Sequence, residues 1–159
     1  MIDDTKTRQA LIEAAIDFIT NNDTLDAGQF GIVTGLPTSP IENIAFENQK
    51  FDTIDKDPWF SVFYLANTPD KRAIGACGID VISGFIQIDV NVPEDTGEAV
   101  HMEWERKARI YFAAGKAFTY QSHNVLVTSS GMGQGRQVEN YFRKSLTVAF
   151  RADLRSVRN

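Results

Sequence analysis

Strict alternation of apolar and polar residues over positions 85–92 is the feature that most limits how this 159-residue chain can fold. Apolar side chains stand at the even positions and polar ones between them: Ile86, Ile88, Val90 and Val92 against Gln87, Asp89 and Asn91. Successive side chains of a strand point to opposite faces, whereas a helix would scatter these groups around its axis. The segment therefore predicts a strand with one face on a core and a polar face that is exposed or at an interface.

Further segments extend this strand into a sheet. Residues 59–66 are apolar on both faces, which predicts a strand covered on both sides, by a helix or by another subunit. A long strand is expected over 138–152, because large apolar residues recur at its even positions. Shorter strands are predicted at 30–34, 41–47, 73–81, 118–120 and 124–129.

Two segments show helical periodicity. The stripe of residues 7–21 consists of Leu11, Ala14, Ala15, Phe18 and Ile19. The stripe of residues 98–114 consists of Val100, Trp104, Ala108, Tyr111 and Phe112. On the second helix, His101 and Lys107 are predicted to be exposed. The order of elements predicts an α+β fold in which residues 1–159 form a single domain, with a mostly antiparallel β-sheet packed against two α-helices.

Two connections interrupt this pattern. Residues 22–40 are rich in glycine and proline, which indicates a long inserted loop with at most the short strand at 30–34. Residues 129–136 read Ser-Ser-Gly-Met-Gly-Gln-Gly-Arg, which predicts a Gly-rich, mobile hairpin loop. Loops as long as the first usually serve a function or lack order.

The residues that could carry chemistry form no recognisable set. The glycines of 131–135 lack the Gly-Lys-Ser/Thr ending of a phosphate-binding loop, and a strand rather than a helix is expected after them. His101, His123 and the single Cys77 do not have the spacing of metal ligands. We therefore predict no catalytic residues, no cofactor and no metal. A small enzyme or ligand-binding domain stays an alternative, and it would need polar groups converging in an apolar cleft.

Charge is distributed unevenly along the chain. Residues 1–60 hold eleven acidic against four basic residues, whereas 61–159 hold ten against twelve. Such asymmetry suggests an interaction surface, although a solvated face with a basic end would look alike. The candidate interface residues are Arg136, Arg143, Lys144, Arg151 and Arg155, with Gln87, Asp89 and Asn91 on the polar face of their strand. The apolar stretches are shorter than the roughly 20 residues of a membrane-spanning helix, so no membrane partner is expected.

A resemblance extends this interpretation. The stretch Ile-Ala-Phe-Glu-Asn-Gln-Lys-Phe at 44–51 is followed by Gly-Phe-Ile-Gln-Ile-Asp-Val-Asn-Val-Pro at 84–93. A helix follows, and then a final strand closing on Phe-Arg-Ala-Asp at 150–153. In order and spacing, these segments resemble the tail terminators of long-tailed bacteriophages, small tail-completion proteins. The similarity spans residues 7–153, and the long 22–40 loop departs from it.

The resemblance implies a structural virion protein, made in the host cytoplasm and placed at the head-tail junction. Such proteins form a homohexameric ring on the head-proximal end of the tail tube and stop its polymerisation. The implied partners are further copies of the chain, the tail tube protein and a head-side connector or stopper protein. DNA would pass through the ring without sequence-specific binding, bordered by a loop of Gly131, Met132, Gly133, Gln134 and Gly135. Another head-tail connector or a tail tube protein of related fold is the nearest alternative.

Overall fold

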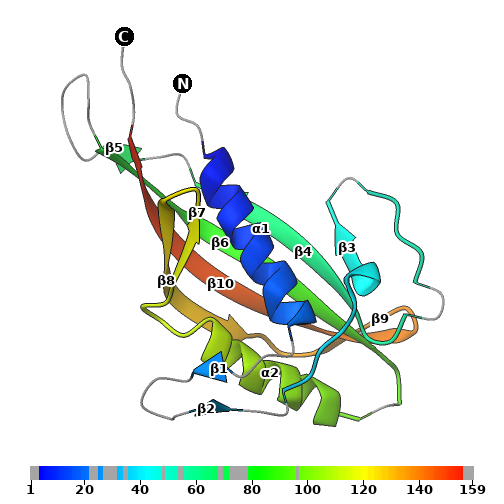
Figure 1. The fold of residues 1–159 in the computed structure, drawn as a ribbon. Coiled ribbons are helices and arrows are strands. Elements are labelled where there is room, and N and C mark those ends of the chain that lie inside the picture. The colour runs from blue at the N-terminus through cyan, green and yellow to red at the C-terminus, as the bar shows by residue number, and fades with distance from the viewer. Residues whose placement is uncertain are drawn as a thin grey trace.

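A computed structural model of the chain shows one twisted sheet with both helices packed on the same face (Figure 1). The sheet and helices share one hydrophobic core, which even-numbered residues of 60–62, 82–92 and 146–152, together with Val125 and Val127, supply from the sheet side. The structure describes residues 4–21, 25–26, 32–33, 36–47, 49–53, 56–67, 70–71, 79–95 and 97–155.

The sheet is antiparallel except where β3 runs parallel to β4. Its strands lie in the spatial order β3 (Ile44–Phe46), β4 (Trp59–Ala66), β6 (Ile79–Pro93), β10 (Tyr141–Arg155), β8 (His123–Met132) and β7 (Ala117–Tyr120). Short strands extend it: β5 (Asp70–Lys71) pairs with β6, and β9 (Arg136–Val138) pairs with β10. This arrangement confirms the predicted α+β fold.

The two helices pack through the apolar stripes that their periodicity predicted. All five stripe residues of α1 (Thr5–Thr20) are buried, and those of α2 (Ala99–Tyr111) are buried except for the partly covered Val100. Trp104 lies at the centre, with its ring centroid 5.6 Å from that of Phe18 on α1 and 4.8 Å from that of Phe60 on β4. The Tyr111 hydroxyl donates a hydrogen bond to Asp17, which joins the two helices.

Between α1 and β4, the chain departs from the predicted elements. The short antiparallel strands β1 (Leu25–Asp26) and β2 (Ile32–Val33) pair with each other, and only β2 lies inside a predicted strand. The predicted strand at 41–47 begins instead with the one-turn 3₁₀-helix η2 (Ile41–Asn43), and β3 follows it.

The predicted strands at 73–81 and 85–92 are wrong as two elements, because β6 runs without a break from Ile79 to Pro93. Residues 73–78 lie outside the described part of the chain. Gly84 does not end the strand. Its missing side chain lets β4 approach, and a Cβ placed there would lie 2.2 Å from the Leu65 carbonyl oxygen. The glycine thus serves close packing of two backbones.

The predicted hairpin loop at 129–136 is also wrong in part. Residues 129–132 belong to β8 and pair with β10, so only Gly133–Gly135 connects β8 to β9. The turn of the last hairpin falls at Glu139 and Asn140, where Glu139 has a φ of 53°. β8 continues to pair with β10 past Gly131 as far as Met132. The pairing needs no side chain at Gly131, because the ladder consists of hydrogen bonds between backbone groups.

His101 and Lys107 are buried rather than exposed, with 0% and 1% of their surface accessible. The His101 Nε2 atom lies 3.1 Å from the Phe142 carbonyl oxygen. The Lys107 ammonium donates to the carbonyl oxygens of Asn21 (3.0 Å) and Pro37 (2.8 Å). Each side chain thus finds a backbone partner from a segment distant in sequence.

The tight contact at Gly84 leads to a first prediction. We expect Gly84→Ala to lower the free energy of unfolding by about 2 kcal/mol, because the added methyl group must push β4 away from β6. Gly131→Ala is the matched control, since a Cβ there meets no atom within 4 Å. Urea unfolding of both variants tests this, and equal stability of the two would contradict the close approach.

Candidate interaction surface

The face of the sheet that the helices leave uncovered carries the odd-numbered side chains of β4, β6 and β10, and we call it the open face. At its centre, Asp89 is 3% and Asn91 0% exposed. The rings of Phe51, Trp59 and Tyr141 form a row in this region, with centroids 5.4 and 5.6 Å apart. Asp89 and Asn91 were predicted to be exposed or at an interface, and this prediction is wrong because their own subunit buries them.

These polar groups form a closed network. The Asp89 Oδ1 atom accepts hydrogen bonds from the Gln87 amide (2.9 Å) and the Ser145 hydroxyl (2.6 Å). Arg143 approaches the other carboxylate oxygen at 3.9 Å and donates from Nε to the Asn91 side-chain oxygen at 2.7 Å. A carboxylate with its oxygens occupied in this way is suited to holding β6 and β10 together rather than to moving protons.

Beside this network, β4 presents apolar side chains to solvent. Phe63 is 37% and Leu65 51% exposed on the open face, while Phe60 and Val62 are buried on the helix face. β4 was predicted to be covered on both faces, and within the subunit only its helix face is covered. Sequence reasoning did not name Phe63 and Leu65 as interface residues, although the two-faced apolar pattern was the signal for them.

Four of the predicted basic residues, Arg136, Arg143, Lys144 and Arg151, do not gather into one surface. Arg143 lies in the buried network with 19% of its side chain exposed, and Lys144 points from β10 to the helix side of the sheet. Arg136 is exposed on β9 and Arg151 on the open face of β10. Arg155 is the last residue of β10. Of the eight candidates, the structure thus brings together Gln87, Asp89, Asn91 and Arg143.

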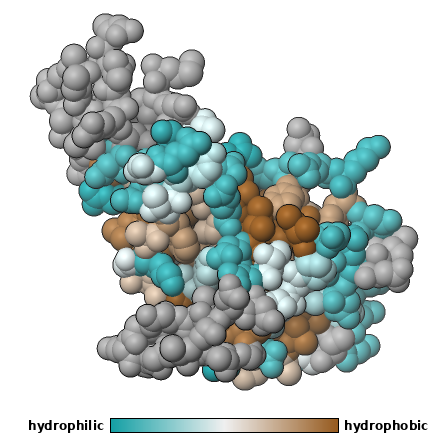
Figure 2. Space-filling model, viewed as in Figure 1, coloured by the Kyte–Doolittle hydropathy of each residue, from teal (hydrophilic) through white to brown (hydrophobic). Residues whose placement is uncertain are grey.

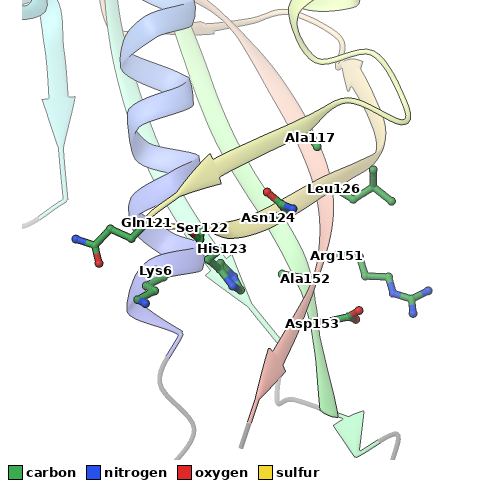
Figure 3. Close-up of a pocket in the computed structure, with 10 residues that line it drawn as sticks. All are labelled: Lys6, Ala117, Gln121, Ser122, His123, Asn124, Leu126, Arg151, Ala152 and Asp153. Carbon is green, nitrogen blue, oxygen red and sulfur yellow. The ribbon is translucent and has the colours of Figure 1, made fainter.

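Arg151 borders a hollow of about 920 Å³ at the end of the sheet near the start of α1 (Figure 3). Lys6, His123 and Asp153 also line it, so its charges are mixed in sign. The His123 Nε2 atom lies 2.7 Å from the Thr7 hydroxyl oxygen, and burial together with Lys6 lowers the pKa of His123, opposed by Asp153. The histidine is thereby engaged in fixing the β7–β8 turn against α1.

On the helix side of the molecule, hydrophilic and apolar residues are interspersed, and an apolar area lies between α1 and β3 (Figure 2). Within the described ranges, no cluster of three or more His, Cys, Asp or Glu side chains could hold a metal ion. No helix in that part of the chain is both long and apolar enough to cross a membrane. The features that stand out are uncovered strand edges and exposed apolar side chains of the sheet, and both kinds of surface commonly mark contacts with other proteins.

The geometry is that of a small α+β protein, and comparison with known proteins gives the family. The family model described as phage tail terminator protein matches residues 33–150. The chain therefore belongs to the phage tail terminator family, and it is a virion component with a structural role related to the phage tail.

Structural comparison adds the fold alone. One solved structure shares 15% sequence identity with this chain at a TM-score of 0.62. The match covers 93% of this chain and 92% of the other. Among curated proteins, no sequence matches.

Proposed function

We propose that this protein forms a homohexameric ring on the head-proximal end of the tail tube. The ring ends tube polymerisation and presents the surface that joins the tail to the head-side connector or stopper protein. The observation that carries the proposal is the family match over residues 33–150. DNA passes through the ring without sequence-specific contacts, bordered by Gly131–Gly135.

The surface of the subunit supports this proposal. A ring needs a heterologous contact, in which one patch of a subunit meets a different patch on the next. The exposed apolar residues Phe63 and Leu65 of β4 lie at one side of the sheet. On the other side, the segment 129–131 of β8 has only small side chains. Two unlike sides on one sheet meet the requirement for head-to-tail contact.

Electron microscopy of the purified protein, alone and mixed with tail tubes, tests the proposal. We expect rings of six subunits, seated on one end of each tube, and tubes that stop growing once capped. Incorporation of the protein along the tube would instead indicate a tube protein. A monomer that leaves tube length unchanged would contradict the proposal.

The exposed Arg151 provides a test of charge in assembly. We expect Arg151→Glu to weaken self-association several-fold at low salt, and the difference from wild type to shrink at high salt, where the Debye length falls to about 3 Å at 1 M. Arg106→Glu makes the same charge change on the exposed side of α2 and serves as the control. Sedimentation velocity measures both, and equal loss in the two variants would mean that net charge, not this site, matters.

A further inference from the structure

Two strand segments on opposite sides of the sheet lack a neighbouring strand among the described residues. β3 covers the outer edge of β4 only over Phe60–Val62, which leaves 63–65 open. β7 covers the outer edge of β8 only over 123–126, and the Val127 amide donates to the Lys116 carbonyl oxygen. Residues 129–131 of β8 are therefore also open. An uncovered edge is a template for pairing with another chain.

The two open segments lie at the same level of the sheet. The paired residues that cross it form continuous rows. One row runs Phe63, Gln87, Thr147, Gly131; the next runs Tyr64, Ile86, Val148, Ser130; the third runs Leu65, Phe85, Ala149, Ser129. Each row begins at one open segment and ends at the other. A rotation about an axis along the strands therefore brings the two segments of neighbouring copies side by side without a shift in register.

We propose that β4 of one copy pairs with β8 of the next, with Tyr64 opposite Ser130, so that a continuous sheet runs around the ring. This inference rests on the ring proposed above and specifies its contact. Each of β4, β6, β10 and β8 is antiparallel to its neighbour. The first and the last of four such strands run in opposite directions, so the new pair is antiparallel as well.

The backbone groups at the two edges point the right way for this pair. The Tyr64 N–H donates to the Glu47 Oε1 atom at 3.3 Å, so it faces away from β6. The Gly133 N–H donates to the Ser145 carbonyl oxygen on β10, so by alternation the N–H and C=O of Ser130 face outward. Two outward-facing residues on one row form the doubly hydrogen-bonded pair of an antiparallel ladder.

Glu47 protects this edge in the free subunit. Its carboxylate occupies the Tyr64 N–H and lies 3.4 Å from the Arg8 guanidinium, with 36% of its side chain exposed. An exposed side chain can leave at small cost when a strand arrives, because surface ion pairs contribute little. Charged groups at sheet edges commonly hold off unwanted pairing in this way.

The side chains at the two edges are complementary. The proposed register places Phe63 opposite Gly131 and Leu65 opposite Ser129 on the open face. The small residues leave room for the exposed apolar ones, and an aromatic ring over a cross-strand glycine is a stabilising arrangement. This contact would cover the apolar face of β4 that the subunit itself leaves exposed.

The flanking strands leave the levels of the three proposed pairs free. β3 lies beside Phe60, Ser61 and Val62. The rows of the first two end at Lys144 and Ser145, where β8 has already ended, and the Val62 row ends at Met132, the last residue of β8. β7 lies beside Leu126, whose row crosses Arg151 and Ser83 at a level where β4 has already ended. Each short strand therefore fills levels that the neighbouring copy leaves free, apart from the Val62 row, where the end of β3 meets the end of the neighbouring β8.

A disulfide between copies tests the pairing. Phe63→Cys with Gly131→Cys, in a Cys77→Ser background, places two thiols opposite each other only across the proposed contact. Within one subunit they are three strand spacings apart, roughly 14 Å, which exceeds the about 7 Å between Cα atoms that a disulfide can bridge. We expect a ladder of covalent oligomers on non-reducing gels after mild oxidation of the protein, alone or on capped tubes.

The matched control is Phe63→Cys with Leu126→Cys. Leu126 is 43% exposed on the same face of β8 but lies beside β7, so this pair should give no ladder. A ladder from the first pair alone supports the contact. Rings or caps without that ladder overturn the contact and leave the proposed function intact, whereas failure to cap tubes counts against the function itself.

A backbone variant gives an independent measurement. Ser130→Pro removes the outward N–H, which makes no hydrogen bond to β10, whereas Ser130→Ala keeps it. We expect Ser130→Pro to weaken self-association at least tenfold with unchanged circular dichroism, and Ser130→Ala to assemble like wild type. Normal assembly of the proline variant would contradict the pairing.

Discussion

Replacing Asp89 with alanine is expected to lower the free energy of unfolding by about 3 kcal/mol, because removing one partner of a buried ion pair leaves the other uncompensated. The carboxylate accepts the hydrogen bonds of Gln87 and Ser145 and lies beside Arg143. Its loss would leave the guanidinium, which is 19% exposed, without a counter-charge. Urea unfolding followed by circular dichroism measures the change.

Asp153→Ala is the control for Asp89→Ala. Asp153 is an exposed carboxylate on the same face of β10, and its removal should cost less than about 0.5 kcal/mol. Combining Asp89→Ala with Arg143→Ala should cost less than the sum of the single changes, since the two groups interact. Additive losses would show that Arg143 does not depend on the Asp89 carboxylate.

The core of this fold was predictable because burial follows periodicity. Alternation over 85–92 placed Ile86, Ile88 and Val90 on the helix face, where all three are fully buried. The stripes of both helices were found for the same reason. Periodicity assigns a residue to a face, and the apolar faces of a small domain must meet.

What covers a polar residue was not predictable in the same way. Asp89 lies on the polar face of β6, yet it is 3% exposed and contacts Gln87, Ser145 and Arg143 within its own subunit. His101 and Lys107 are polar positions on a helix, and their partners Phe142, Asn21 and Pro37 are far away in sequence. Such burial depends on tertiary contacts that no local pattern encodes.

The candidate interface was predicted from charge, and charge alone does not say which way a side chain points. Arg143 and Arg151 share one face of β10 as alternation requires, but Arg143 donates a hydrogen bond to Asn91 within its own subunit. The open edges of β4 and β8 could not be seen either, because an edge is defined by where neighbouring strands end. That information comes only from the strand register.

The buried Lys107 gives the stability of this protein an unusual dependence on pH. Burial lowers the pKa of Lys107 to about 8, and the Asp17 carboxylate opposes that shift. Between pH 8 and the ordinary lysine pKa near 10.4, the unfolded chain holds a proton that the folded chain has released. Raising the pH disfavours the state that binds more protons, which here is the unfolded state, so the free energy of unfolding increases.

We therefore expect the free energy of unfolding to rise by about 2 kcal/mol between pH 7.5 and 9.5, since each pKa unit corresponds to 1.36 kcal/mol. The range stops at 9.5 because burial raises the pKa of Tyr64 and Tyr111, and ionisation of tyrosine in the unfolded chain near pH 10 acts in the opposite direction. Urea unfolding across this range measures the slope.

Lys107→Met keeps the apolar stem of the side chain but cannot take up a proton, so its profile should lack this rise. Lys116→Met, which removes a partly exposed lysine at the start of β7, should keep the wild-type slope. Other groups that titrate in the range contribute equally to all three proteins, so the differences isolate Lys107. Parallel profiles for wild type and Lys107→Met would show that the ammonium group stays charged in the folded protein throughout the range.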